Sequence, residues 1–144
     1  MVQMVLGAIA GYVLFAVLGA VALYGMLAFV GPGSALDAGF LYVSGLWLII
    51  SLFVTGWVAG LAGKLAAKVG ERPEAAVILG LAIAIQGFFM MPSDFDTGTL
   101  TMAQLETLSS VDLLEYLRFP EWYARTLPLF AAAFAGYGGY IAKR

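Results

Sequence analysis

The sequence contains no cysteine and no histidine, and only 11% of its 144 residues are charged. The first two absences exclude disulfide bonds, thiol chemistry, histidine-ligated haem and the cysteine or histidine sites that bind zinc and copper. Soluble domains carry about 25% charged residues, whereas 62% of this chain is apolar. We therefore expect an integral membrane protein, and we expect it to use no cofactor.

Four apolar stretches are long enough to cross a membrane as helices, namely residues 4–30, 41–61, 75–91 and 123–142. A hydrocarbon core about 30 Å thick needs roughly 20 residues at the rise of an α-helix. The first stretch lacks a basic start and is longer than the apolar part of a secretory signal, so we interpret it as a membrane helix. The sequence predicts an all-α fold in which residues 1–144 form one domain of four transmembrane helices.

The basic residues predict the orientation, because cytoplasmic loops of membrane proteins retain Lys and Arg. Most of them lie between the second and third predicted helices or at the end of the chain: Lys64, Lys68, Arg72, Lys143 and Arg144. The other connections are mainly acidic, so both termini should be cytoplasmic. We expect anionic lipid to be the partner of Lys64, Lys68 and Arg72, and we expect no binding of nucleic acid.

Residues at the predicted helix ends favour the same layout. Gly70 suits a left-handed stop after the second helix, and Pro73 with Glu74 suits the first turn of the third. Glu121 and Arg125 have the spacing of an ion pair on the fourth helix. The sequence therefore predicts a short basic turn between the second and third helices.

The outer loop, residues 92–122, is the only long polar segment. Two pairs in it have the spacing of a capping box, Thr101 with Gln104 and Ser109 with Asp112. We expect two short amphipathic helices on the outer membrane surface. After them, Trp122 and Tyr123 would anchor the chain at headgroup depth.

Asp94 and Asp96 begin this loop, and Asp96 opens an Asp-Thr-Gly triplet. Aspartic proteases need two such triplets that face each other across a β-built cleft, and this chain has one triplet among helices. The two aspartates are weak candidates for a metal site, since calcium takes at least six oxygen ligands. We interpret the segment as an exposed polar turn, and we expect the protein not to be an enzyme.

Small residues recur at helical spacing along all four predicted helices. The glycines of these stripes are Gly7, Gly11, Gly19, Gly56, Gly60, Gly80, Gly87, Gly136 and Gly139. Helices in lipid associate through close backbone approach, which small residues permit. The stripes predict helix packing, either within one chain or against an identical chain or another subunit.

Few polar residues lie within the apolar stretches. Gln86, Ser51 and Thr55 favour hydrogen bonds between helices, and a polar path for a solute is the alternative. A quinone or lipid cleft lined by Trp47, Trp57 and Met90 is a further alternative, although such residues usually serve packing.

Four segments carry a resemblance to a known kind of protein: "AGYVLF" (10–15), "GWVAGLAGKLAAKVGERP" (56–73), "PEWY" (120–123) and "AGYGGYIAKR" (135–144). Together they resemble small, uncharacterised four-helix families of the bacterial inner membrane. In those families a Gly-Tyr first helix, a basic cytoplasmic link and a Pro-x-Trp start of a glycine-rich last helix occur in this order. The resemblance implies topology and location in a bacterial inner (plasma) membrane, and it transfers no function.

Two functions remain open from the sequence. The first is a non-enzymatic membrane module, either an accessory subunit or a homo-oligomeric packing protein, that assembles through its small-residue helix faces. The alternative is a small oligomeric channel or carrier for an uncharged or weakly polar solute. We expect the first, because the predicted helices contain no Asp, Glu or Lys in their interior, and Arg125, the one charged residue among them, is close to the start of the fourth.

Overall fold

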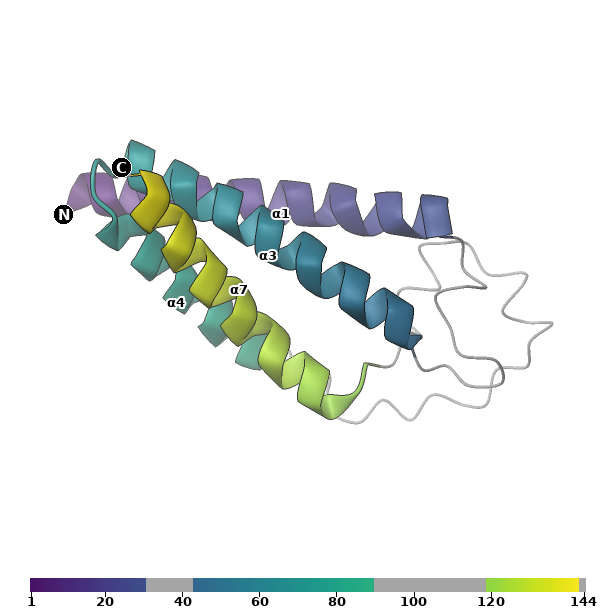
Figure 1. The fold of residues 1–144 in the computed structure, drawn as a ribbon. Coiled ribbons are helices and arrows are strands. Elements are labelled where there is room, and N and C mark those ends of the chain that lie inside the picture. Colours follow the sequence, from purple (N-terminus) through teal and green to yellow (C-terminus); the bar gives the residue numbers. More distant parts are fainter. Residues whose placement is uncertain (31–42, 90–118, 143–144) are drawn as a thin grey trace.

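The computed structural model describes residues 1–30, 43–89 and 119–142, which form four α-helices (Figure 1). These are α1 (Val2–Val30), α3 (Gly45–Val69), α4 (Glu74–Phe89) and α7 (Glu121–Ala142). No strand occurs in these three ranges, so the described part of the chain is all-helical, as predicted. The short helices expected in the outer loop, together with Asp94, Asp96 and Met90, lie outside the described residues.

The four helices form one bundle in which α3 packs against α1 and α7, and α4 packs mainly against α7. Figure 1 shows the N-terminus and the end of α7 beside the α3–α4 turn, where Arg72 lies, with Lys68 in the last turn of α3. We call this end of the molecule the basic end. The helices lie close together there and spread apart toward the opposite end, where α1 finishes and α7 begins (Figure 1).

Helix α3 continues beyond the apolar stretch, which was expected to end at residue 61. It ends at Val69, directly before the Gly70 that the sequence offered as its stop. Lys64 and Lys68 are therefore helical, and their positive charges lie near the negative end of the helix dipole, where cations are favourable. At the other end, the Ser44 hydroxyl accepts a hydrogen bond from the Trp47 backbone N–H at 3.3 Å and caps the helix.

The α3–α4 turn does not have the left-handed residue at Gly70 that the sequence predicted. Gly70 has right-handed geometry (φ −76°, ψ −7°), and the left-handed residue is Glu71, with φ 57°. Glycine is needed at position 70 for space, because a Cβ there would lie 2.6 Å from the Ala75 Cβ and 2.9 Å from the Ala66 carbonyl oxygen. The turn is thus set by close helix approach, and the strained φ falls on the exposed residue that follows.

Small side chains dominate the centre of the bundle, and large apolar side chains face outward. The buried residues at the main helix contacts are mostly alanine: Ala8, Ala59, Ala62, Ala66, Ala67, Ala75, Ala76, Ala131 and Ala135. Two helical segments, Val2–Phe29 and Gly45–Val69, are long and apolar enough to cross a membrane. In the most apolar 18-residue part of each segment, only 17% and 28% of the residues are buried, whereas the core helix of a soluble protein is mostly buried.

Candidate functional site

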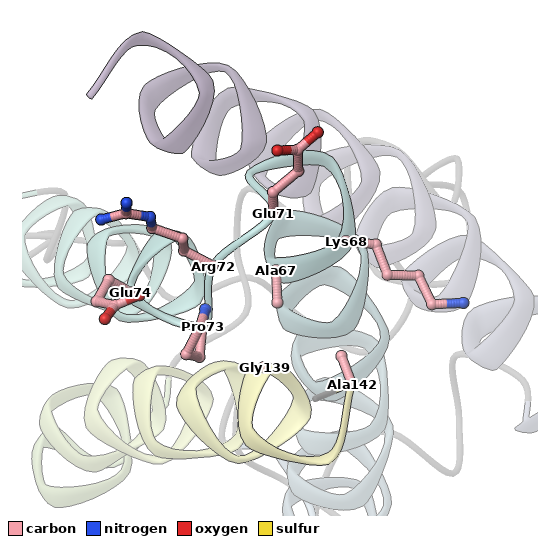
Figure 2. A pocket seen from close by; sticks show the side chains of 8 residues that line it. All are labelled: Ala67, Lys68, Glu71, Arg72, Pro73, Glu74, Gly139 and Ala142. Atoms are coloured by element: carbon pink, nitrogen blue, oxygen red, sulfur yellow. The ribbon is translucent and has the colours of Figure 1, made fainter. Parts of the chain in front are cut away.

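The described residues line cavities at opposite ends of the bundle. The first, of about 370 Å³, is at the basic end between the α3–α4 turn and the end of α7 (Figure 2). Its lining carries charges of both signs, from Lys68 and Arg72 and from Glu71 and Glu74. Figure 2 shows Lys68 and Arg72 pointing to opposite sides, with Glu71 directed away from both. The charges do not converge on a point where one ligand group would sit.

The second cavity, of about 260 Å³, is lined by α1, α3 and the start of α7 with the preceding Phe119. We call it the aromatic cavity, because Phe15, Trp47, Phe119 and Tyr123 line it. Aliphatic residues complete most of the lining, and Ser51 and Thr55 add two hydroxyl groups. The arrangement of a mainly apolar space with a few polar groups is typical of sites for small molecules.

Trp47 is the most unusual residue of the aromatic cavity. It is 0% exposed and packs against Leu27 at the end of α1 and against Val43. Its indole Nε1 is buried, and no described residue accepts a hydrogen bond from it. An indole N–H only donates, and leaving a buried donor without an acceptor costs about 1–3 kcal/mol. Such a group in a folded protein calls for an explanation.

A hydrogen bond between Ser51 and Tyr123 joins α3 to α7 at the rim of the same cavity, with 2.5 Å between the two hydroxyl oxygens. The Ser51 hydroxyl also donates to the Leu48 carbonyl oxygen at 3.1 Å. Tyr123 is only 2% exposed, and Phe119 stacks on its ring. The sequence assigned Tyr123 to the membrane surface beside Trp122, but only Trp122 is exposed.

The three polar residues that the sequence offered as a solute path do not share one cavity. Ser51 and Thr55 both line the aromatic cavity. Gln86 lies on α4, and its side-chain oxygen accepts a hydrogen bond from the Tyr12 hydroxyl on α1. Gln86 therefore joins two helices, which is the first of the two interpretations that the sequence left open.

The glycines named from the sequence occupy different environments. A Cβ at Gly7, Gly11 or Gly80 would come within 3 Å of backbone or side-chain atoms of a neighbouring helix. The same holds for Gly56, Gly87 and Gly139, where the nearest atoms belong to Phe130, Pro128 and Ala76. These six positions are where helices approach within one chain.

Gly60, Gly19 and Gly136 differ from the other six. A Cβ at Gly60 would meet only the Phe134 carbonyl oxygen, at 3.8 Å, which is ordinary contact. A Cβ at Gly19 or Gly136 would have no atom of the described residues within 4 Å, so a side chain would have room there.

The tightest contacts instead involve Gly63 and Gly138, which the sequence stripes left out. A Cβ at Gly63 would lie 1.9 Å from the Ala135 carbonyl oxygen, and one at Gly138 would lie 2.0 Å from the Gly60 carbonyl oxygen. The pattern Gly-x-x-Gly at 60–63 and the pair Gly-Gly at 138–139 would have been the signal, but their spacings are shorter than the four-residue spacing used to find the stripes.

The cleft proposed for Trp47, Trp57 and Met90 is not formed as predicted. Trp57 is 68% exposed and does not line the aromatic cavity, because it lies on the outward side of α3. The residues that the sequence missed are Phe15, Phe119 and Tyr123, which come from two other helical regions. Only the folded bundle brings them next to Trp47.

None of the protein-family models, curated proteins or solved structures compared with this chain matches it. The resemblance to four-helix bacterial membrane families therefore stays a prediction. What the site does has to be inferred from its geometry.

Proposed function

We propose that this chain is an integral membrane protein whose four helices cross the bilayer. We further propose that it is a non-enzymatic module that assembles with itself or within a larger membrane complex. Its location would be a bacterial inner membrane, with the basic end and both termini in the cytoplasm.

One observation carries the membrane proposal, which is that the bundle has small residues inside and large apolar residues outside. Ile9, Val13 and Val17 on α1 are more than half exposed, as are Ile49, Phe53 and Trp57 on α3. Water would make that surface unfavourable. In lipid the same surface meets hydrocarbon, and association depends on the close approach that alanine and glycine allow.

The two remaining helices belong to the same bundle and share its environment. Helix α4 has 16 residues and α7 has 22, and both pack on the two helices that are long and apolar enough to cross a membrane. At 1.5 Å per residue, a helix as short as α4 covers about 24 Å, which a bilayer accommodates by local thinning. A membrane that contains α1 and α3 would therefore also contain α4 and α7.

The exposed cations at the basic end support the proposed orientation and a lipid partner. Lys64, Lys68 and Arg72 are all exposed, and positively charged ends of membrane helices stay on the cytoplasmic side. Anionic headgroups of that leaflet would attract each of them. Nucleic acid is not proposed as a partner, because the chain carries a net charge of −2 and its cations would lie at a lipid surface.

Two features support a packing role. The polar side chains between helices are used to join them, as in the Tyr12–Gln86 and Ser51–Tyr123 hydrogen bonds. Gly136, in contrast, has open space beside it although it belongs to the small-residue face of α7. A second helix could approach α7 closely at that position.

The alternative, a small oligomeric channel or carrier, has less support from the geometry. A solute path would need Gln86 to continue the polar groups of Ser51 and Thr55. In the described residues, Gln86 instead bonds to Tyr12 and does not line the aromatic cavity.

Native mass spectrometry of the protein, extracted gently from its own membrane, tests the assembly. We expect a mass above that of one chain: a mixed complex would make the protein an accessory subunit, and a complex of identical chains would make it a homo-oligomeric packing protein. Gly136→Leu should reduce the complex to single chains, because the added side chain fits the lone bundle but blocks a neighbour. Ala16→Leu, which adds bulk to the exposed side of α1, is the control. A single-chain mass for the unaltered protein would contradict the proposal.

A further inference from the structure

The aromatic cavity and the unpaired indole N–H of Trp47 point to a bound molecule. The cavity is mainly apolar, and no Lys, Arg, Asp or Glu is among its described lining residues. A ligand with a formal charge would lose its hydration there without gaining a partner. The occupant would therefore be neutral and largely apolar.

The Trp47 side chain adds a specific requirement. Its Nε1 is buried without an acceptor among the described residues, and Trp47 is one of the residues that line the cavity. A ligand oxygen that accepts this hydrogen bond would satisfy the donor. The hydroxyls of Ser51 and Tyr123 already bond to each other. The indole N–H of Trp47 is therefore the donor of this site that still requires an acceptor.

We propose that the aromatic cavity binds a neutral lipophilic molecule whose carbonyl oxygen accepts a hydrogen bond from Trp47 Nε1. A volume of about 260 Å³ is slightly below the roughly 300–1,000 Å³ of sites for drug-sized ligands. It suits one carbonyl-bearing ring or the first part of an acyl chain. The ring carbonyl of a quinone and the ester carbonyl of a membrane lipid both have this chemistry.

In a variant whose only tryptophan is Trp47, the fluorescence of that residue reports binding in the aromatic cavity. Trp57 and Trp122 are 68% and 62% exposed, so Trp57→Phe with Trp122→Phe should leave the bundle intact. The purified protein in detergent is titrated with a benzoquinone bearing a ten-carbon chain, and separately with a phospholipid brominated in its acyl chain. Both quench indole fluorescence at short range. We expect saturable quenching of Trp47 by at least one probe, and the probe that saturates identifies the source of the carbonyl.

The control for non-specific quenching is a variant with Trp47→Phe and Trp57→Phe, in which Trp122 is the only tryptophan. Trp122 sits outside the cavity at the start of the same helix as Tyr123. We expect its quenching to rise linearly with probe and not to saturate. Equal quenching of both reporters would mean that the probes only partition into the detergent, and it would overturn the proposal.

Two glycines of α1 provide a matched pair of blocking variants. Gly19 lines the aromatic cavity and Gly25 does not, and a Cβ at either position would have no atom of the described residues within 4 Å. Gly19→Leu should fold, fill the cavity and abolish saturable quenching, while Gly25→Leu should bind as the unaltered protein does. If Gly19→Leu binds equally well, the ligand lies elsewhere.

The hydrogen bond itself is tested by Trp47→Phe in the otherwise unaltered protein, which keeps an aromatic ring and removes the donor. Retention of the quinone or lipid is measured by native mass spectrometry, with a decylbenzene of similar size as the probe without a carbonyl. We expect at least tenfold weaker retention of the carbonyl probe and unchanged retention of decylbenzene. Unchanged retention of both would show that Trp47 Nε1 is not the donor and would overturn this assignment.

Discussion

The two ends of the bundle are held together in different ways. At the basic end, glycines let backbones touch, as where Gly63 meets Ala135 and Gly138 meets Gly60. At the opposite end, large side chains fill the space between the spreading helices, and Trp47 and Tyr123 are among the largest fully or almost fully buried residues. The basic end holds a cavity of about 370 Å³ whose charged side chains point in different directions, whereas the packing of large rings at the opposite end leaves a mainly apolar cavity of about 260 Å³. The difference indicates close helix packing at the basic end and a site that suits an apolar ligand at the opposite end.

The largest expected effect comes from removing the Trp47 ring at the end opposite the basic end. Trp47→Ala should lower the free energy of unfolding by about 3–5 kcal/mol, because it removes a fully buried side chain and leaves a larger cavity in its place. Trp57→Ala is the matched control on the same helix, and its effect should stay below about 1 kcal/mol, since that ring is exposed. Unfolding by a denaturing detergent measures both. Equal losses would mean that Trp47 does not anchor this end.

The next effect sharpens the comparison at the basic end. Gly63→Ala should lower the free energy of unfolding by about 1–3 kcal/mol, because the new methyl group would overlap the Ala135 backbone. Gly60→Ala, one turn away, should be neutral or stabilising by less than about 1 kcal/mol. Its Cβ would lie 3.8 Å from the Phe134 carbonyl oxygen, which is ordinary contact, and alanine favours the helix. The same unfolding assay applies. A Gly60 variant that is the more damaging of the two would refute the assignment of the contact.

The smallest effect concerns the hydrogen bond that closes the rim of the aromatic cavity. A double-mutant cycle with Ser51→Ala and Tyr123→Phe should give a coupling energy of about 0.6 kcal/mol, and below about 1.7 kcal/mol, as for other hydrogen bonds between membrane helices. Each variant removes one hydroxyl of the pair. A coupling indistinguishable from zero would mean that packing of Tyr123 alone joins α7 to α3 here.

Much of the layout could be predicted from the sequence because it depends on local signals. The apolar stretches located α1, α3, α4 and α7, and Glu121 and Arg125 form the ion pair that their spacing predicts. The apolar stretch ends at residue 61 whereas α3 continues to Val69, and the stop signal at Gly70 located this end better than hydropathy did. Hydropathy marks the limit of lipid and not of helical geometry.

The site was less predictable, because it depends on which faces meet. A glycine stripe shows that close approach is possible, but not which helix will use it, so Gly136 was grouped with Gly139 although only the latter is in close contact. Tyr123 was placed at the membrane surface by its neighbour Trp122, yet its ring turns inward to Ser51. These outcomes depend on helix rotation, which a sequence pattern of one chain does not fix.

The central proposal is that the bundle crosses a membrane with its tight, basic end in the cytoplasm. Because the chain has no cysteine, Glu74→Cys and Glu121→Cys each introduce a single thiol, at exposed positions on opposite ends. Intact cells are treated with a thiol reagent that does not cross membranes. We predict labelling at position 121 and none at position 74 until the cells are opened. Labelling at 74 alone would reverse the orientation, and equal labelling at both positions would contradict a membrane-spanning bundle.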